Sequence, residues 1–334
     1  MTSNAPPSHA VSVILCTYNG AAYLGEQLQS IAEQTLLPAE LIASDDGSTD
    51  ATLELLERFR LEAPFPVRIL RNASTIGSTA NFDQAMSHAS GTYLALADQD
   101  DVWLPHKLAT LVDVLVSDNT LGAAFSDAWL LDSRTSSTGK PSPRPHKQTL
   151  WSMHGFTKSK QALFNTRAGA LRLLLRADVV TGATMLLRSD LRPLWQPIPK
   201  SWVHDGWLSW ILATQSHIRA VPEPLMYYRL HGQQQLGVGA ASTFLGRVEV
   251  VALTARARYS RVAAQFQDLL ERLRLFHVEP MLEHQIACKI RLLQRRAALP
   301  KGTLRRTLAI LASARDYRLY ARGLRSMRKD VFLN

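Results

Sequence analysis

The sequence changes from apolar to acidic within the stretch Leu96-Ala97-Asp98-Gln99-Asp100-Asp101-Val102-Trp103. The apolar run 93–97 predicts a buried strand that ends where the acids begin. Carboxylates packed this closely raise one another's pKa unless solvent or a cation relieves them, and Mg²⁺ or Mn²⁺ takes oxygen ligands of this kind. An isolated Asp-x-Asp is more often a solvated turn. The position after a predicted strand favours a ligand site, because open α/β sheets bind ligands at that edge.

Strands and helices alternate around this stretch. The pattern predicts strands at 11–15, 41–44, 67–70, 93–97 and 122–126, and helices at 23–34, 51–60, 81–88 and 106–117. Further along, it predicts a strand at 179–188, a helix at 202–213 and a last strand at 226–229. Alternation with short connections is typical of a mostly parallel, doubly wound α/β sheet. The Ser-, Pro- and Arg-rich segment 133–148 is predicted to be an exposed loop.

The amino-acid composition limits the classes of protein to which this chain can belong. With 334 residues, of which 46% are apolar and 20% charged, the chain can bury a sizeable core and is neither a fibre nor a disordered protein. Cys16 and Cys288 are the only cysteines, which predicts no disulfide framework and a reducing compartment. Residues 1–10 resemble no signal peptide and are predicted to be disordered. We therefore expect a cytoplasmic protein.

The positive charge is concentrated in the last part of the chain. Residues 241–334 contain 19 lysines and arginines against seven acidic residues, which leaves a net charge of −2 for the first 240. This segment is rich in Leu, Ala and Arg and predicts two or three amphipathic helices, over 245–296 and 303–327. A basic tail favours an anionic partner such as a membrane surface, a lipid-linked diphosphate or nucleic acid.

A second acidic cluster, Asp45-Asp46, follows the predicted strand 41–44. Taken alone, Asp-Asp-Gly-Ser is more often a capped turn than a ligand site. We expect the two strands to be neighbours, so both clusters face one crevice if the sheet is parallel. A nucleic-acid-binding protein would explain the basic tail but gives no reason for two acidic clusters at strand ends.

Three motifs resemble the inverting family 2 glycosyltransferases, which have the GT-A nucleotide-diphosphosugar-transferase fold. They are Ser12-Val13-Ile14-Leu15-Cys16-Thr17-Tyr18-Asn19-Gly20, Ser44-Asp45-Asp46-Gly47-Ser48-Thr49-Asp50 and Ala97-Asp98-Gln99-Asp100-Asp101-Val102-Trp103-Leu104-Pro105. Further matches resemble the rhamnosyltransferase branch of bacterial surface polysaccharide synthesis. These are Thr181-Gly182-Ala183-Thr184-Met185, Val203-His204-Asp205-Gly206-Trp207 and Tyr227-Tyr228-Arg229-Leu230-His231-Gly232.

The resemblance implies a role for each motif residue. Nucleotide-sugar binding is implied for Thr17, Tyr18, Asn19, Asp46, Asp98, Gln99 and Arg229. Asp46 would contact the pyrimidine, and Arg229 would face phosphate. A divalent metal, Mg²⁺ or Mn²⁺, is implied at Asp98, Asp100, Asp101 and His231. Asp205 matches the family's general base; without the resemblance, a helix N-cap is the more frequent role. A lone His before Gly is likewise more often structural than a ligand.

The resemblance also implies a reaction and a domain plan. We expect transfer of L-rhamnose, with inversion, from dTDP-L-rhamnose to a hydroxyl of a lipid-linked glycan in O-antigen or other surface polysaccharide synthesis. The alternatives are a UDP-hexose or UDP-N-acetylhexosamine donor, or a non-catalytic nucleotide-sugar-binding module. The expected catalytic domain spans 11–239, with a nucleotide-sugar half at 11–127 and an acceptor half at 128–239. The basic helices at 240–334 are expected to rest on the inner face of the cytoplasmic membrane, or alternatively to pack on the catalytic domain or a partner subunit.

Overall fold

The computed structural model describes residues 9–132, 148–231 and 255–332. Within these ranges the strands form one sheet in the order β3-β2-β1-β4-β7-β6-β8-β5. Their bounds are β1 (Val11–Thr17), β2 (Glu40–Asp45), β3 (Val67–Arg71), β4 (Tyr93–Asp98), β5 (Val102–Trp103), β6 (Leu121–Asp132), β7 (Met185–Arg188) and β8 (His217–Leu230). Strands β3, β2, β1 and β4 are parallel, as are β6 and β8, whereas β7 and β5 are antiparallel to their neighbours. The predicted α/β class and mostly parallel sheet are confirmed.

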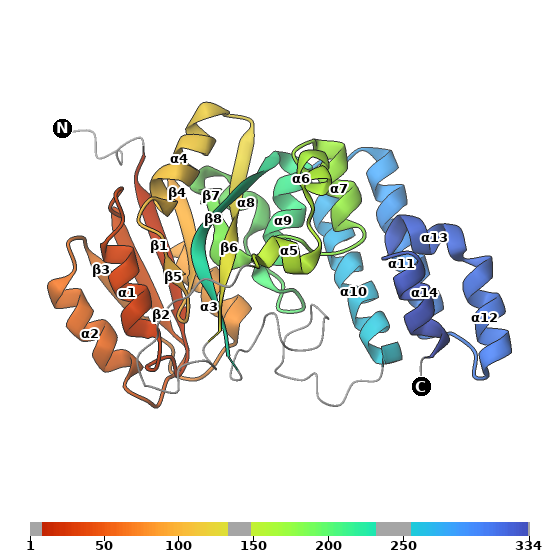
Figure 1. Cartoon of the computed structure of the whole chain (residues 1–334), viewed down its shortest axis with the longest axis horizontal. Helices are drawn as coiled ribbons and strands as arrows, with labels where there is room; N and C mark the ends of the chain where they lie inside the picture. The colour runs from red at the N-terminus through yellow and green to blue at the C-terminus, as the bar shows by residue number, and fades with distance from the viewer. Residues whose placement is uncertain (1–8, 133–147, 232–254, 333–334) are drawn as a thin grey trace.

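Helices cover both faces of the sheet (Figure 1). Helices α1 (Leu24–Ala32), α2 (Thr52–Glu62) and α4 (Lys107–Ser117) pack on one face, where β1 contributes Val13 and Leu15. Helices α3 (Ser78–Ser87) and α9 (His204–Gln215) pack on the other, where β1 contributes Ile14. Because side chains alternate along a strand and both faces are covered, β1 must be apolar almost throughout. This explains the run Val11-Ser12-Val13-Ile14-Leu15, in which Ser12 is buried but donates to Glu40.

The middle of the chain differs most from prediction. Short helices that the sequence pattern did not indicate lie at α5 (Leu150–His154), α6 (Lys158–Phe164), α7 (Arg167–Leu174) and α8 (Arg192–Trp195). The predicted strand 179–188 is wrong in its first half, because residues Gly182–Thr184 form a 3₁₀ turn and β7 begins only at Met185. Most of the predicted loop 133–148 lies outside the described residues.

The C-terminal region consists of more helices than predicted. The described part contains α10 (Ala255–Arg274), α11 (Pro280–Ala297), α12 (Thr303–Ala312), α13 (Ala314–Tyr320) and α14 (Leu324–Val331). Pro280 occupies the first turn of α11, where its missing N–H costs nothing. Gly302 and Gly323 precede α12 and α14 with φ values of 92° and 56°, which favour glycine.

Helix α10 attaches this region to the sheet domain, and it lies between α9 and the last helices in Figure 1. The Phe266 ring packs against Trp202 and Trp210, with centroids 5.7 and 5.5 Å apart. The Trp202 indole donates a hydrogen bond to the Gln265 carbonyl at 2.9 Å. One apolar cluster therefore extends from β1 and β4 through α9 to the C-terminal helices. The predicted boundary at 239–240 lies outside the described residues.

Asp330 connects four of the C-terminal helices. Its fully buried carboxylate on α14 accepts hydrogen bonds from Tyr259 on α10, Arg296 on α11 and Tyr317 on α13. The donor–acceptor distances are 2.5, 2.7 and 2.6 Å. Because a buried carboxylate is costly unless it is paired and hydrogen-bonded, this cluster requires all four helices in one arrangement.

The first strand of the chain lies at the centre of the nucleotide-binding half. β1 pairs with β2 on one side and with β4 on the other, so that Thr17 is opposite Asp45 and Cys16 is opposite Asp98. The prediction that the strands carrying the two acidic clusters are direct neighbours is therefore wrong. The clusters still share one edge, because the chain reverses its winding direction at β1, and this switch point is where doubly wound sheets bind ligands.

Candidate active site

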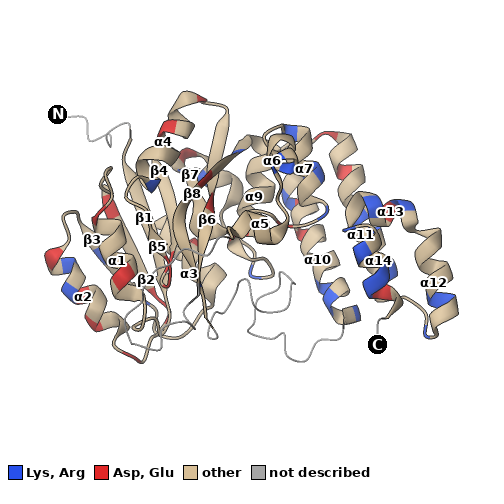
Figure 2. Cartoon of the chain, in the orientation of Figure 1, with Lys and Arg blue, Asp and Glu red and all other residues tan. Residues whose placement is uncertain are grey.

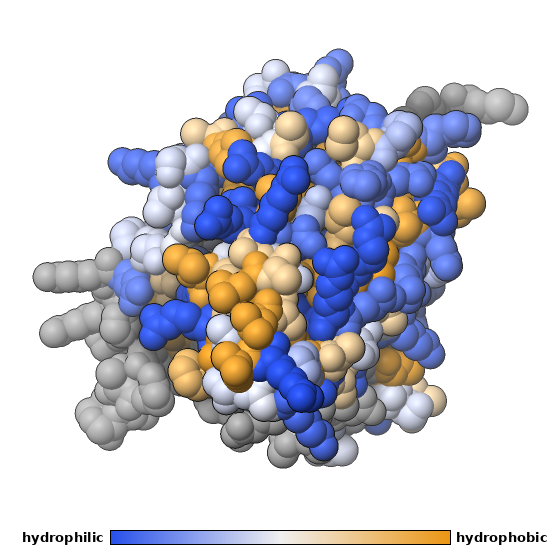
Figure 3. All heavy atoms as spheres, turned by 90° about the vertical axis from the view of Figure 1, so that its right-hand side faces the viewer, coloured by the Kyte–Doolittle hydropathy of each residue, from blue (hydrophilic) through white to orange (hydrophobic). Residues whose placement is uncertain are grey.

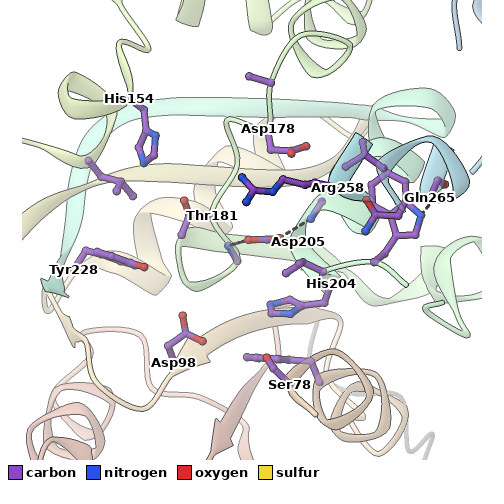
Figure 4. A pocket seen from close by; sticks show the side chains of 18 of the residues that line it. Ser78, Asp98, His154, Asp178, Thr181, His204, Asp205, Tyr228, Arg258 and Gln265 are labelled. Carbon is purple, nitrogen blue, oxygen red and sulfur yellow. Dashed lines mark hydrogen bonds between the residues drawn. The ribbon is translucent and has the colours of Figure 1, made fainter. Parts of the chain in front are cut away.

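A cavity of about 740 Å³ opens at the carboxyl ends of β1 and β4 and continues to the C-terminal helices (Figure 4). Most of the predicted site residues line it, namely Thr17, Tyr18, Asn19, Asp46, Asp98, Gln99, Asp100, Asp205 and His231. Asp101 and Arg229 are buried behind this lining. The sequence motifs are thus brought together from the loops after β1, β2, β4 and β8 and from the first turn of α9.

The loop after β1 is fixed by side chains from two other motifs. The Tyr18 N–H donates to Gln99 Oε1 at 2.8 Å, and Gln99 Nε2 donates back to the Tyr18 carbonyl at 3.1 Å. A Cβ atom at Gly20 would lie 2.1 Å from Gln99 Oε1, so this close approach requires glycine. Asn19 has a positive φ of 47° and donates its N–H to Ser48 Oγ at 2.8 Å. Gln99 therefore orients the loop.

The two carboxylates after β2 differ in what they contact. Asp45 is fully buried and accepts hydrogen bonds from Thr17 Oγ1 at 2.9 Å and from the Ser48 N–H at 2.9 Å. It therefore anchors Thr17 and the turn and does not reach the cavity.

Asp46, the next residue, lines the cavity. Its carboxylate accepts hydrogen bonds from Asn72 Nδ2 at 2.9 Å, the Ile76 N–H at 2.8 Å and the Gly77 N–H at 2.9 Å. These donors come from the loop between β3 and α3 and fix the orientation of the carboxylate. Oδ1 accepts two of these bonds and Oδ2 accepts one, so Oδ2 has a lone pair left for a ligand, as contact with a base would require.

The acidic stretch after β4 gathers three carboxylates. Asp98, Asp100 and Asp101 each place an oxygen within 4.8 Å of the others. Burial and then the charges of Asp100 and Asp205 raise the pKa of Asp98 to about 7. Burial and then the charges of Asp100 and Asp98 raise the pKa of Asp101 well above its usual value. Repulsion of this kind is relieved by a positive charge between the oxygens.

The donor set fits a hard divalent cation. Carboxylate oxygens are the ligands that Mg²⁺ and Mn²⁺ prefer. Among the residues that the structure describes, the buried Asp101 Oδ2 has no hydrogen-bond partner, whereas Asp101 Oδ1 accepts from the Arg229 N–H at 3.1 Å. Asp98 and Asp100 line the cavity and are better placed than Asp101 to share a cation with a ligand.

The segment at the end of β8 packs against this cluster. His231 Nε2 lies 2.7 Å from Asp100 Oδ2, and both side chains face the cavity. Arg229 Nε donates to the Asp100 carbonyl at 2.7 Å, and its guanidinium forms an ion pair with Glu26 at 2.9 Å. Only 2% of Arg229 is exposed, and its guanidinium lies over the Tyr23 ring. This geometry favours a positioning role for Arg229 over the predicted phosphate contact.

Asp205 lies across the cavity from Asp98 (Figure 4). It belongs to the first turn of α9, whose N-cap is Val203, so Asp205 is not the helix cap that its position suggested. Its carboxylate accepts hydrogen bonds from the Gly182 N–H at 3.1 Å and the Gly206 N–H at 2.6 Å. Burial raises its pKa to about 7. A buried carboxylate that ionises near neutral pH suits a general base.

Gly182 allows its own N–H to approach the Asp205 carboxylate, because a side chain at this position would clash with His204. A Cβ atom there would lie 2.7 Å from His204 Nε2 and 3.4 Å from Asp205 Cβ. His204 stacks on Phe82 with centroids 4.0 Å apart, and burial lowers its pKa to about 3, so its ring is neutral. The side chains of Phe82 and His204 thus form an uncharged wall beside the carboxylate.

Sequence reasoning missed several residues around the cavity. Lys107 is fully buried at the start of α4, donates to the Ala183 carbonyl at 2.6 Å and partly compensates the charges of Asp98 and Asp101. No local pattern distinguishes it from a surface lysine, because its burial depends on tertiary packing. The C-terminal helices also line the cavity, although their arginines were predicted to be a surface feature.

The fold and this cavity define a nucleotide-diphosphosugar transferase of the GT-A class. In solved structures the same fold occurs in S. aureus TarS 1-349 in complex with UDP-GlcNAc, with a TM-score of 0.58, 15% identity and coverage of 93% of this chain and 81% of that one. It also occurs in mannosyltransferase PcManGT from Pyrobaculum calidifontis, in complex with GDP-Man and Mn²⁺, with a TM-score of 0.55, 18% identity and coverage of 93% and 77%.

The chain matches Glycosyl transferase family 2 over residues 12–193 and belongs to that family. It is 27% identical to the uncharacterized glycosyltransferase alr2836 of Nostoc sp. over 70% of this chain and 68% of the relative. It is also 36% identical to dTDP-rhamnosyl transferase RfbG of Shigella flexneri, over 31% of this chain and 38% of the relative. A third relative is WfgD of Escherichia coli, a UDP-Glc:alpha-D-GlcNAc-diphosphoundecaprenol beta-1,3-glucosyltransferase. This match is 28% identical over 33% of this chain and 43% of the relative.

Proposed function

We propose that the protein transfers a sugar, with inversion, from a nucleotide diphosphate donor to a hydroxyl of a glycan. One observation carries this proposal: a single cavity joins a carboxylate cluster suited to a cation and a diphosphate to a buried Asp205 whose pKa is about 7. A module that only binds nucleotide sugars has no use for the second feature.

The residues around the cavity have separate roles in this reaction. The ionised Asp205 carboxylate, held by the Gly182 and Gly206 N–H groups, takes the proton of the acceptor hydroxyl. The acceptor oxygen forms its bond to the anomeric carbon on the face opposite the leaving diphosphate, whose C–O bond breaks, so the anomeric centre inverts. Asp98 and Asp100 would hold a divalent cation, which would supply Lewis-acid stabilisation of the leaving diphosphate. His231 and Arg229 hold Asp100 in place.

The donor we propose is dTDP-L-rhamnose. Support comes from the motifs around Gly182, Asp205 and His231 and from the similarity to the dTDP-rhamnosyl transferase RfbG. UDP-glucose and UDP-N-acetylhexosamine are the alternatives, because WfgD uses UDP-Glc and TarS is solved in complex with UDP-GlcNAc.

A donor panel tests both the reaction and the sugar. Purified protein is incubated with Mg²⁺ or Mn²⁺ and dTDP-rhamnose, UDP-glucose, UDP-N-acetylglucosamine or GDP-mannose, and thermal stabilisation and nucleotide release are measured. We expect dTDP-rhamnose to stabilise the protein most and to release dTDP. Turnover of a UDP-sugar without any response to dTDP-rhamnose would disprove the rhamnosyl assignment. Stabilisation without turnover of any donor, in the presence of glycan acceptors, would favour a binding module.

We propose that the acceptor is a lipid-linked glycan of surface polysaccharide synthesis and that α12 contacts the membrane that carries it. Leu304, Leu308 and Leu311 lie on one face of α12 and are 76%, 60% and 57% exposed. Figure 3 views the end of the molecule where α12 lies and shows an apolar patch bordered by hydrophilic side chains. Exposed basic side chains on α12 and α13, among them Arg305 and Arg318, complement the negative charge of anionic lipid headgroups.

No helix among the described residues is long and apolar enough to cross a membrane. Contact at the surface of the membrane is therefore the form of association that we propose.

A further inference from the structure

The end of the cavity away from the acidic cluster is basic. Figure 2 shows lysine and arginine gathered on the C-terminal helices. Six of these side chains line the cavity, and we refer to them as the basic wall: Arg258, Lys289, Arg296, Arg322, Arg325 and Lys329. They are contributed by α10, by α11, and by α14 together with the residue just before Gly323. The cavity thus has an acidic end and a basic end, with Asp205 between them.

The spacing of these residues directs them to one side. On α14, Arg325 and Lys329 are four residues apart, and Ser326 beside them also lines the cavity. On α11, Lys289 and Arg296 are seven residues apart, with Leu293 between them on the same face. Residues four and seven apart lie on one face of a helix. Each of these two helices therefore presents two basic side chains to the cavity on one face, and on α11 Leu293 lies between them.

Part of this positive charge has no neutralising partner. Arg296 is paired with Asp330 at 2.7 Å. Lys289 donates to the Leu175 and Tyr320 carbonyls at 3.0 and 2.6 Å, which engages two of its three N–H groups and does not neutralise its charge. Over residues 9–132, 148–231 and 255–332, the side chains of Arg322, Arg325 and Lys329 take part in no hydrogen bond or ion pair.

The basic side chains of this wall also repel one another. Burial and then Arg296 lower the pKa of Lys289 to about 7, with Arg322 acting in the same direction. Burial and Arg325 lower the pKa of Arg322, and burial and Arg258 lower that of Lys329. Asp178 acts against this effect on Lys289 and Arg322, and it is itself mostly removed from solvent, with its pKa raised to about 6 by burial. A partly enclosed site with a net positive charge attracts and binds anions.

We propose that the basic wall binds a phosphate group of the acceptor while the acceptor hydroxyl lies at Asp205. This inference rests on the proposed function. The donor already occupies the acidic end, and an anion there would be repelled by Asp98 and Asp100 without a cation. Arginine and lysine are the side chains that recognise phosphate. Because one cavity of about 740 Å³ must hold the hydroxyl, the donor sugar and the phosphate, the phosphate lies close to the reacting sugar.

Two kinds of acceptor carry such a group. The phosphate could belong to the diphosphate that links a short glycan to its lipid, or to a phosphate monoester carried by the glycan itself. Inorganic pyrophosphate and farnesyl diphosphate represent the first, and glycerol 3-phosphate represents the charge of the second.

The test is calorimetric titration of the full chain in EDTA, which removes cation-dependent binding at the acidic end. The variant Arg325→Gln/Lys329→Gln removes two unpaired charges of the basic wall. The control Arg318→Gln/Arg328→Gln removes two exposed arginines of α13 and α14 that do not line the cavity, so the change in net charge is the same. We expect the first variant to bind pyrophosphate about tenfold or more weakly, and the control to change affinity by less than about twofold.

The outcomes separate this inference from the proposed function. Tighter binding of the two diphosphates than of glycerol 3-phosphate identifies the lipid linkage as the source, and equal binding identifies a glycan phosphate. If wild-type protein binds none of the three anions, or if the two variants lose affinity equally, the basic wall is not an acceptor site. Binding of the nucleotide of the preferred donor with Mg²⁺, measured on the same proteins, should be unchanged in both variants. Absence of nucleotide binding in the wild type would contradict the proposed function instead.

Discussion

Asp205 is the residue whose replacement most directly tests the proposed reaction. We expect Asp205→Asn to lower kcat by about 10²–10⁴-fold, the usual contribution of a general base, and to leave donor affinity nearly unchanged. The side chain lies across the cavity from the acidic cluster, so it does not touch the proposed nucleotide subsite (Figure 4). Steady-state turnover and isothermal titration with donor measure the two quantities, and a kcat within threefold or so of wild type would remove Asp205 from this role.

Loss of fold would not explain that result. Because burial opposes ionisation of Asp205, the neutral Asn should not lower the free energy of unfolding. Its single amide oxygen can accept from the Gly182 N–H or from the Gly206 N–H but not from both, and this lost hydrogen bond offsets part of the gain by about 1 kcal/mol. Thermal denaturation of the two proteins provides the control.

The pH dependence of kcat tests the same residue independently. A general base must be ionised, and burial raises the pKa of Asp205 to about 7. At saturating donor and Mg²⁺, kcat should be constant above this pH and fall about tenfold per pH unit below it. The remaining activity of the Asn variant should lack this slope, whereas an unchanged profile would point to another titrating group.

Asp100 should have the opposite kinetic signature. Asp100→Asn removes a charge from the proposed cation site and weakens the contact with His231 Nε2. Donor binding that depends on Mg²⁺ should therefore weaken. The measurement is the affinity for the nucleotide of the preferred donor with and without Mg²⁺. Equal affinity of variant and wild type under both conditions would place the cation elsewhere.

At this scale the sequence predicts which residues line the cavity better than what each one contacts. Short motifs identify Asp46, Asp98, Asp100 and Asp205, because each lies at the end of a strand or the start of a helix. The burial of Arg229 on Glu26 and the orienting contact of Gln99 with Tyr18 depend on residues 203 and 81 positions apart in the sequence, so no local pattern predicts them.

At the scale of helices, the Asp330 carboxylate should control how the C-terminal region packs. Asp330→Asn leaves the guanidinium of Arg296 without its counter-charge, and Arg296 is only 8% exposed. Breaking a buried ion pair from one side costs about 3–5 kcal/mol, so we expect a loss of that order in the free energy of unfolding. Urea denaturation followed by circular dichroism measures it.

A matched control comes from a neighbouring exposed pair. Arg295 lies 3.1 Å from Asp316, but their side chains are 58% and 32% exposed. Asp316→Asn should therefore cost less than about 1 kcal/mol. Similar costs for the two Asp→Asn variants would mean that Asp330 does not hold the helices together.

Helices and strands were predictable where the apolar residues of a segment repeat with one clear period. The strands β1, β2 and β4 and helices α1, α2 and α4 lie close to their predicted positions because each has a clear apolar pattern. Helices α5 to α8 are four to eight residues long, too short for a helical period to emerge. The C-terminal helices are amphipathic, and periodicity alone does not say which partner their apolar face meets.

At the scale of the whole molecule, the C-terminal helices serve the active site as well as the surface. The sequence predicted one basic tail of uniform role. The structure divides its charges: Arg322, Arg325 and Lys329 line the cavity, whereas Arg305, Arg315 and Arg318 lie on α12 and α13 outside its lining. Removing all residues after 239 would therefore uncover Trp202 and Trp210, against which Phe266 packs, and would open the cavity. Point substitutions on α12 are the appropriate test of membrane contact.

We predict peripheral, salt-sensitive binding to anionic membranes through α12. Leu304 and Leu308 would insert among the acyl chains, and each nearby basic residue would contribute about 1 kcal/mol at low ionic strength. Flotation with phosphatidylglycerol liposomes should recover the protein at low salt and lose it at high salt, because screening shortens the reach of the charges.

The variant Leu304→Ser/Leu308→Ser should stay unbound even at low salt. Leu37→Ser/Leu61→Ser is the matched control, since these leucines are 47% and 81% exposed but belong to the α1–α2 end of the molecule, opposite α12 in Figure 1. This control should float like the wild type. If wild-type protein does not float at low salt, the leucine face is not a membrane contact. Sedimentation equilibrium then tests the remaining explanation, because a face that joins two copies of the chain would give a dimer that the α12 variant dissociates.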